Sequence, residues 1–436
     1  MEVGVTGPFN ELPIELLVII FRELSNKDRG SCCQVCKRWR EAIISVPSMW
    51  HKVEVTVHPG WNWRNTISFF GHKDSRLYLH VRHLVLNLER RAQGPQTVYA
   101  PQANAVLSSV SKLLRALPHA MTLRSFSFSG FKYYNASKDW KSRVICDLCK
   151  FLTRQRRFLE EVSFTSLELL SKPSSGRLLM AVAATDEEAG ESKVKRLSLT
   201  KMLHITATPG RAFVKAIERF SYLEHIEITF EHLTDEIIKT LVFACPLLRR
   251  LTILFDFSVQ PYLKDHLSLL IWNEVVDKNP DLRVVLWLMV GDSVCSYLMN
   301  QSMYLIQIPV EGLIVDVSSL NTITPVVNCY LDTMANQFGN YLAFLELSSV
   351  VRGSWCYGPA LVNLVNKCPR LASISLKNIV LDLETATAIS ACSGSTERGK
   401  IKLRVGGICV SGDASSNALE EGIRQLKDSL DLQIFM

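Results

Sequence analysis

The chain has 436 residues, of which 47% are hydrophobic and 21% are charged, and its formal net charge is +7 at neutral pH. One ordinary hydrophobic core does not organise a chain of this length, so a small head and an extended or repetitive body are expected. The charge is too weak and too scattered for a nucleic-acid binder, and the absence of any run of 18 apolar residues argues against a membrane span.

The N-terminal residues do not resemble a secretory signal, because Glu2 follows Met1 directly and Arg22 and Glu23 interrupt the first apolar run. The 12 cysteines are therefore expected to be free thiols in a reducing compartment. The sequence thus predicts a cytoplasmic and/or nuclear protein.

The first predicted helix is apolar around almost its whole circumference. It begins at about Pro13, whose missing N–H has no helical partner in a first turn, and it ends before Ser25. Its apolar residues include Leu16, Leu17, Val18, Ile19, Ile20 and Phe21. Such a helix must be covered on every side.

A second helical segment follows, with Asn26 or Asp28 expected to accept hydrogen bonds from its free amides. Its apolar positions follow helical spacing and are Cys32, Val35, Trp39 and Ile43, and Pro47 ends it. Because one helix cannot cover every side of its neighbour, one face is expected to be left for another surface.

Residues 9–50 resemble an F-box. The residues at the separations found in that family are Leu12, Pro13, Glu15, the apolar run to Phe21, Leu24, Asp28, Val35 to Trp39 and Trp50. The segment departs from the family at Arg29, where an apolar residue is usual, and at Met49, where Leu is commoner.

The resemblance implies docking on the Skp adaptor, which links F-box proteins to a cullin scaffold and its RING subunit in a ubiquitin ligase. Both the family positions and the uncovered apolar helix identify the residues that contact the adaptor or support that contact. They are Leu12, Pro13, Leu16, Ile19, Ile20, Val35, Trp39 and Trp50.

After Trp50, a pattern of the form apolar-x-x-apolar-x-apolar recurs through the chain. Its copies are Val81-Leu84-Leu86, Leu123-Phe126-Phe128, Leu159-Val162-Phe164, Val194-Leu197-Leu199, Leu223-Ile226-Ile228, Leu248-Leu251-Ile253, Leu282-Val285-Trp287, Val310-Leu313-Val315, Leu342-Leu345-Leu347 and Leu371-Ile374-Leu376. The interval between copies ranges from 25 residues (Leu223 to Leu248) to 42 (Val81 to Leu123). Each interval accommodates one strand, one helix and two turns.

The junctions before two of these copies repeat as well. Cys245-Pro246 precedes Leu248 and Cys368-Pro369 precedes Leu371, each after apolar residues with helical spacing, and Asn279-Pro280 is a weaker third copy. These junctions resemble those of the cysteine-containing leucine-rich repeats found behind many F-boxes. The predicted fold is therefore α/β: a helical F-box over residues 9–50, then an irregular leucine-rich-repeat solenoid over residues 51–436 with a parallel concave sheet.

Further segments complete this prediction. Val53, Val55 and Val57 alternate like a strand directly after the F-box, and the final helix with Leu432–Ile434 is expected to cap the far end. Segments rich in Gly, Pro or Ser are expected to be loops, at 89–104, 171–176, 393–400 and 411–417.

Motifs that imitate catalytic or metal sites are incomplete. Gly394 to Lys400 matches a phosphate-binding loop, but Ile401 replaces its hydroxyl residue and a strand replaces its helix. The pairs Cys33/Cys36 and Cys146/Cys149 lack a second pair at zinc spacing. We therefore expect no catalytic residues, no metal and no cofactor.

The concave face is the predicted target-binding surface, because residues that alternate with the apolar strand positions point there. The predicted residues are Ser125, Ser127, Ser163, Arg196, Ser198, His225, Glu227, Arg250, Thr252, Glu346, Ser373 and Ser375. The strand near Trp287 fits worst, since Val284, Leu286 and Leu288 leave no polar alternate. The basic clusters at 154–157 and 193–196 are short and separate, which is typical of solvated faces.

The sequence therefore predicts a substrate-recognition subunit of a Skp/cullin/F-box ubiquitin ligase. Its partners would be the Skp adaptor, through it the cullin and RING subunits, and an unknown protein substrate, with neither nucleic acid nor membrane involved. A leucine-rich-repeat scaffold or inhibitor without a ubiquitin role is the alternative. A nucleotide hydrolase that uses the turn at Gly394 is the third class, which titration with ATP and magnesium distinguishes.

Overall fold

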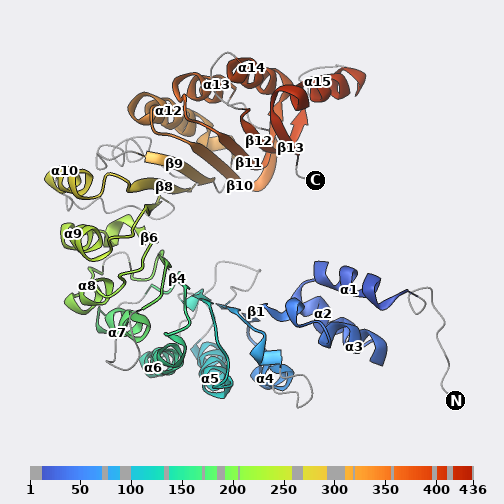
Figure 1. Ribbon diagram of the computed structural model, residues 1–436, viewed down its shortest axis with the longest axis vertical. Coiled ribbons are helices and arrows are strands. Elements are labelled where there is room, and N and C mark those ends of the chain that lie inside the picture. Colours follow the sequence, from blue (N-terminus) through green and yellow to red (C-terminus); the bar gives the residue numbers. More distant parts are fainter. Residues whose placement is uncertain are drawn as a thin grey trace. The chain divides into compact units, whose positions relative to one another are not determined.

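The computed structural model describes residues 12–70, 77–88, 100–131, 137–168, 172–183, 192–204, 207–257, 269–291, 310–317, 320–354, 358–394, 400–409 and 416–434. The chain divides into two compact units, Met1–Leu223 and Glu224–Met436. Each unit repeats a strand followed by a helix, with the strands on one side and the helices on the other (Figure 1). The predicted α/β repeat architecture behind a helical head is thus confirmed.

The first unit begins with four short helical elements and continues as repeats. The initial elements are α1 (Ile14–Glu23), α2 (Asn26–Cys32), α3 (Lys37–Ile44) and the 3-10 helix η2 (Pro47–Trp50). The repeats comprise β1 (Lys52–Val57), α4 (Trp63–Phe70), η3 (Leu77–Leu79), β2 (His83–Leu88), α5 (Ala100–Ala116), β3 (Ser125–Ser129), α6 (Lys138–Gln155), β4 (Glu161–Thr165), α7 (Lys172–Ala183), β5 (Arg196–Leu199) and α8 (Arg211–Ile217).

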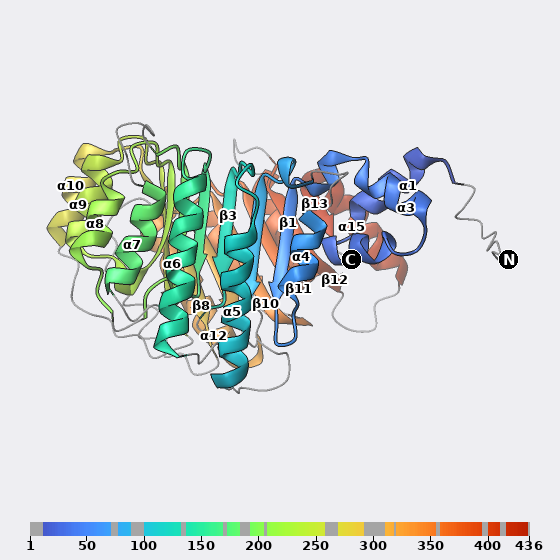
Figure 2. The same ribbon diagram turned by 90° about the horizontal axis from the view of Figure 1, so that it is seen from below.

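Strands β1 to β5 pair in parallel and in chain order. Figure 2 shows helices α4 to α7 side by side on one face of this sheet. Every second strand residue is buried against them, and the Phe126 ring of β3 lies 5.5 Å from the Phe151 ring of α6. Burial of an aromatic side chain contributes about 2–3 kcal/mol, so the repeated apolar positions hold the two layers together.

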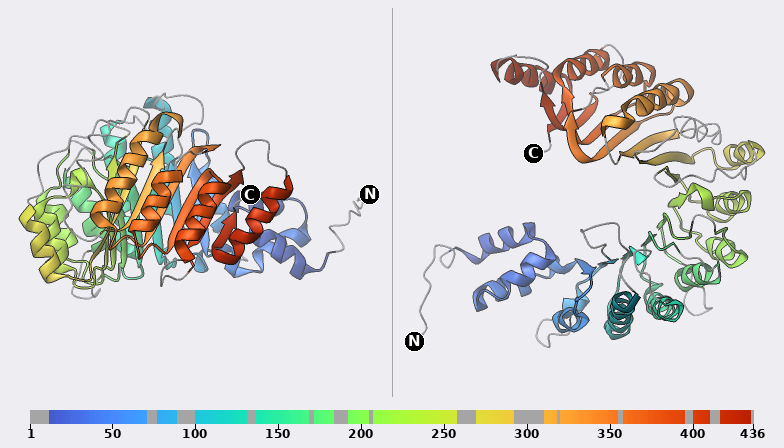
Figure 3. Two further views of the ribbon diagram at one scale, coloured as in Figure 1. Left: turned by 90° about the horizontal axis from the view of Figure 1, so that it is seen from above. Right: turned by 180° about the vertical axis from the view of Figure 1, so that it is seen from behind.

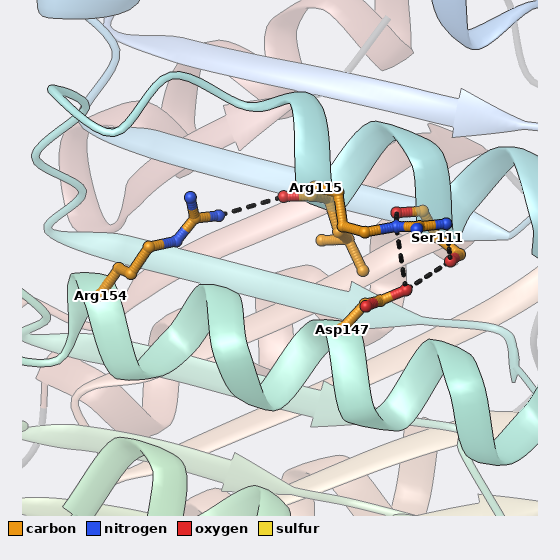
Figure 4. A network of polar contacts seen from close by, with 5 residues as sticks. Ser111, Arg115, Asp147 and Arg154 are labelled. Carbon is orange, nitrogen blue, oxygen red and sulfur yellow. Dashed lines mark hydrogen bonds and ion pairs between the residues drawn. The ribbon is translucent and has the colours of Figure 1, made fainter.

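One buried carboxylate lies within the helical layer of the first unit. Asp147 of α6 is 7% exposed, accepts a hydrogen bond from the Ser111 hydroxyl of α5, and forms an ion pair with Arg115 at 3.4 Å (Figure 4). Arg154 of α6 donates to the Leu114 carbonyl at 3.2 Å. These contacts compensate the desolvation of the carboxylate and fix α5 against α6.

The second unit contains strands β6 to β13, again parallel and paired in chain order. Figure 3 shows its later helices packed across one face of the sheet. Its elements are β6 (His225–Thr229), η5 (Phe230–His232), α9 (Asp235–Ala244), β7 (Arg250–Asp256), α10 (Leu269–Lys278), β8 (Arg283–Val290), β9 (Val310–Val317), α12 (Leu320–Phe338), β10 (Phe344–Ser354), α13 (Gly358–Lys367), β11 (Ser373–Asp382), α14 (Leu383–Gly394), β12 (Lys402–Cys409), α15 (Ser416–Ser429) and β13 (Asp431–Ile434).

The predicted repeat junctions are present. Helices α9 and α13 end immediately before Cys245 and Cys368, and both cysteines are fully buried. At the third copy, the side-chain amide of Asn279 donates to the Leu248 carbonyl at 2.8 Å, which links this junction to the previous one. The predicted strands at 53–57 and 432–434 also exist, as β1 and β13.

Two loop predictions were wrong. Residues 100–104 belong to α5, and residues 172–176 form the first turns of α7. Pro101 and Pro173 were misleading because proline is well tolerated in a first helical turn. Gly176 is a packing residue, since a Cβ atom there would lie 2.6 Å from that of Ala212 in α8.

The other loop predictions fall largely on residues 89–99, 395–399 and 411–415, outside the described part. Residues 393–394 end α14, and residues 416–417 begin α15. Among the described helices, none combines the length and hydropathy that a bilayer span requires.

Candidate functional site: the N-terminal helical subdomain

Helix α1 has one buried and one exposed apolar side. Leu17 and Phe21, four residues apart, are 1% and 2% exposed. Leu16, Ile19 and Ile20 share the other side and are 45%, 56% and 42% exposed. The expectation of an incompletely covered apolar helix is therefore confirmed.

The segment after α1 is two helices, so the single-helix expectation was wrong. Ser25, rather than Asn26 or Asp28, caps α2, because its hydroxyl accepts from the Asp28 amide at 3.2 Å. The Cys36 thiol accepts from the Trp39 amide at 3.4 Å and caps α3. A side-chain acceptor at position 36 stabilises a new helix start and separates Val35 from the α3 face.

Arg29 connects three of these elements. Its guanidinium donates to the Phe21 carbonyl at 2.8 Å, the Arg22 carbonyl at 2.7 Å, the Met49 carbonyl at 2.5 Å and the Asn26 side-chain oxygen at 3.2 Å. Partial burial lowers the pKa of Arg29, and nearby Glu23 opposes this shift. Arg29, at which the sequence departs from the family pattern, thus links α1, α2 and η2 by hydrogen bonds. These contacts of Arg29 are called here the polar joint.

Two tryptophans of the subdomain contact its helices. The Trp39 ring packs edge-on against Phe21 with a centroid distance of 5.2 Å. Trp50 is 1% exposed, and its indole N–H donates to the Ile43 carbonyl at 3.1 Å. Trp50 therefore belongs to the supporting core and is not available for direct contact with a partner.

The remaining predicted adaptor residues lie at the start of α1 and in the turn before α3. Arg38 donates to the Leu12 carbonyl, which fixes the start of α1 against the first turn of α3. Pro13 is exposed, Leu12 is half-buried, and Val35 is 64% exposed. The backbone at Leu12 therefore contacts α3, and Pro13 and Val35 remain accessible to a partner.

Residues 9–56 match the sequence model of the F-box-like family. They form an F-box-like domain. The match extends six residues beyond the expected end at residue 50 and into β1. F-box-like domains are protein-interaction modules, so this match supports a protein-interaction role for the chain.

Among solved structures, an internalin from Listeria monocytogenes is similar, with 12% sequence identity, 94% coverage of each chain and a TM-score of 0.29. A TM-score this low supports no inference. No curated protein matches the chain at a significant level.

The predicted target-binding residues lie on the sheet face opposite the helices, called here the helix-free face. Three of them form ion pairs with residues on other strands of the sheet. Arg196 pairs with Glu161, Arg250 with Glu311 at 3.2 Å, and Glu346 with Lys377.

Within the second unit, the helix-free face holds a smaller cluster in β6 and β7. The His225 ring lies 2.9 Å from the Thr252 hydroxyl and 3.9 Å from Glu227. Thr252 is only 4% exposed, so it orients His225 rather than presenting its own hydroxyl to a target. Ser198 is half-buried.

The prediction of which β8 residues face the core was wrong by one residue. Val284, Leu286 and Leu288 are fully buried, and Val284 and Leu286 pair with the core residues Leu251 and Ile253. Trp287 therefore lies on the helix-free face, where its indole N–H donates to Asp316 at 2.5 Å. A strand that is apolar from residue 284 to 290 carries no alternation from which to read its phase.

Three cysteines of the two pairs are helix-capping or partly buried residues. Cys36 caps a helix, and burial raises the pKa of the Cys33 thiol and that of Cys149, the latter to about 11. Within the described ranges, no three His, Cys, Asp or Glu side chains are grouped as metal ligands. In the segment from Gly394 to Lys400, which matches part of a phosphate-binding loop, Gly394 ends α14 and residues 395–399 are outside the described part. Strand β12 begins shortly after it, at Lys402.

Proposed function

We propose that this protein is the substrate-recognition subunit of a Skp/cullin/F-box ubiquitin ligase. The observation that carries the proposal is the exposed apolar side of α1, formed by Leu16, Ile19 and Ile20 on an F-box-like domain. Exposed apolar residues in one group are typical of protein–protein interfaces. The Skp adaptor, and through it the cullin and RING subunits, would bind this side.

The catalytic step would belong to the conjugating enzyme recruited by the RING subunit. This chain would hold a target lysine near the ubiquitin thioester and raise its effective concentration. The helix-free face would bind the target, since it presents polar side chains along successive strands. This function requires a reducing compartment, cytoplasmic and/or nuclear.

The test is co-purification of the full-length chain with the Skp adaptor. Ile20→Glu should abolish retention, because a charge at a desolvated apolar contact costs about 3 kcal/mol or more. Leu12→Ala combined with Pro13→Ala should also abolish retention, because it removes predicted adaptor contacts. Val276→Glu is the matched control, since Val276 of α10 is 40% exposed and lies outside residues 9–56. Its retention should equal that of the wild type.

Adaptor retention by folded Ile20→Glu at the wild-type level would contradict the proposal and favour a repeat scaffold or inhibitor without a ubiquitin role. Circular dichroism establishes that each variant is folded. Leu17→Glu is unsuitable as a test because Leu17 is 1% exposed, and its replacement would disrupt the subdomain itself.

A further inference from the structure

Basic residues gather at one edge of the sheet in the first unit, at the starts of β1, β2, β3 and β5. They come from separate parts of the sequence and include two members of the 193–196 cluster. The five residues are Lys52, Arg82, Arg124, Lys195 and Arg196, called here the basic edge.

The parallel register places these residues in two adjacent rows. Lys52, His83, Ser125, Glu161 and Arg196 are successive partners in one row. The preceding row is connected by backbone hydrogen bonds from Arg82 to His51, Arg124 to Arg82, Glu160 to Arg124 and Lys195 to Glu160. Neighbouring strands are about 4.8 Å apart, so five strands spread the basic edge over about 19 Å.

The positive charge of the basic edge exceeds the negative charge beside it. Three carboxylates lie beside the five cations, namely Glu160, Glu161 and Glu54 on the same side of β1 as Lys52, which leaves a formal charge of +2. The Arg124 and Arg196 side chains remain 65% and 63% exposed despite their ion pairs with these carboxylates. The Arg82 guanidinium donates to the carbonyl and the hydroxyl of Thr122. Both acceptors are neutral, so they do not compensate the charge of Arg82.

The opposite edge of the same sheet differs in character. The last residues of the five strands are uncharged: Val57, Leu88, Ser129, Thr165 and Leu199. The pKa of His83, which pairs with Lys52 of the basic edge, is lowered by burial first and then by His51, Lys52 and Arg124. Charged residues thus gather where these strands begin and are absent from their last positions.

Short hydroxyl side chains continue from the basic edge over the helix-free face. Ser125, Ser127, Ser163 and Ser198 are half-buried and lie on β3, β4 and β5. Side chains this short allow another polypeptide to approach the sheet closely and to accept or donate hydrogen bonds. The surface thus combines cations at its border with hydroxyl groups beside them.

We propose that the basic edge binds an extended protein segment rich in Asp and Glu, and that this segment is what the target presents to the chain. The inference rests on the proposed function and specifies the chemistry of its target. Charge complementarity supports this occupant, because carboxylates along one extended chain would pair with cations spread along the edge. An extended chain advances about 3.3 Å per residue, so about six residues span the basic edge.

The test measures binding of a labelled peptide with about six Asp and Glu residues to the full-length protein by fluorescence anisotropy. Lys52→Glu combined with Arg124→Glu should weaken binding by about tenfold or more, because two attractions become repulsions. Lys112→Glu combined with Lys150→Glu is the matched control, since both lysines are exposed on the outer helices α5 and α6. The control should change affinity less than about twofold.

Equal binding by both double variants would overturn the inference. So would equal binding of a peptide in which Asn and Gln replace Asp and Glu, or a preference for an RNA oligonucleotide of the same charge. Adaptor co-purification is measured on the same preparations. Failure of adaptor binding by the wild-type protein contradicts the proposed function alone, and failure of peptide binding with the adaptor retained contradicts this inference alone.

Discussion

Replacement of Arg29 by methionine tests whether the polar joint maintains the F-box-like domain. Methionine preserves much of the side-chain length but removes the four hydrogen bonds of the guanidinium, three to main-chain carbonyls and one to Asn26. Phe21 and Met49, which supply two of these carbonyls, are 2% and 3% exposed, so those carbonyls would lose their partner within the packed subdomain.

The expected magnitude follows from these two contacts. A hydrogen bond to a charged group contributes about 1.5–3 kcal/mol, and the half-exposed guanidinium calls for the lower part of that range. Loss of both should therefore lower the free energy of local unfolding by about 3 kcal/mol. That change increases the opening equilibrium constant by about 150-fold, since each 1.4 kcal/mol is a factor of ten.

Hydrogen exchange of the amides in α1 to α3, followed by mass spectrometry of the full-length protein, measures this opening. Arg40→Met is the matched control, because the exposed Arg40 side chain donates one hydrogen bond, to the Cys33 carbonyl at 2.9 Å. Its exchange should accelerate less than about threefold. If the amides exchange equally fast in the two variants, the contacts of Arg29 do not hold α1, α2 and η2 together.

Three further predictions concern the repeats. Arg196→Glu combined with Arg250→Glu should weaken target capture under proteasome inhibition while adaptor binding persists, and survival of both activities would move recognition away from these two positions. Asp147→Ala should lower the stability of the protein in urea by about 2–3 kcal/mol, because it removes the buried carboxylate that joins α5 to α6; a loss below about 0.5 kcal/mol contradicts this account. At pH 8, Cys149 should be alkylated more slowly than exposed Cys146, because burial raises the Cys149 pKa to about 11 and keeps the thiol protonated; equal rates by mass spectrometry would disprove it.

The sequence was most informative where apolar and polar residues alternate. In β3, Phe126 and Phe128 are buried and the intervening serine is not, so both the strand and its core face could be predicted. In β8 the alternation disappears, and only pairing with β7 determines that Trp287 faces away from the helices. Neighbouring strands therefore supply the phase that a uniformly apolar segment lacks.

Local polar contacts were harder to predict in the F-box-like domain. The division between α2 and α3 depends on the Cys36 thiol, a weak acceptor that composition alone does not mark as a helix cap. The sequence identified Arg29 as a departure from the family but gave no partner for it, because Met49 is 20 residues away in the chain. Contacts of this kind become visible only once the helices are placed.

The function of Arg29 extends to the first repeat of the solenoid. Arg29 binds the Met49 carbonyl, and Asn26 donates to the Lys52 carbonyl at 3.1 Å, so α2 holds the chain on both sides of the junction between η2 and β1. A docked α1 would consequently fix the direction of β1, the strand at which the basic edge begins. Under the proposed function such a link would matter, because a flexible linker would dilute the target over a larger volume and lower its effective concentration.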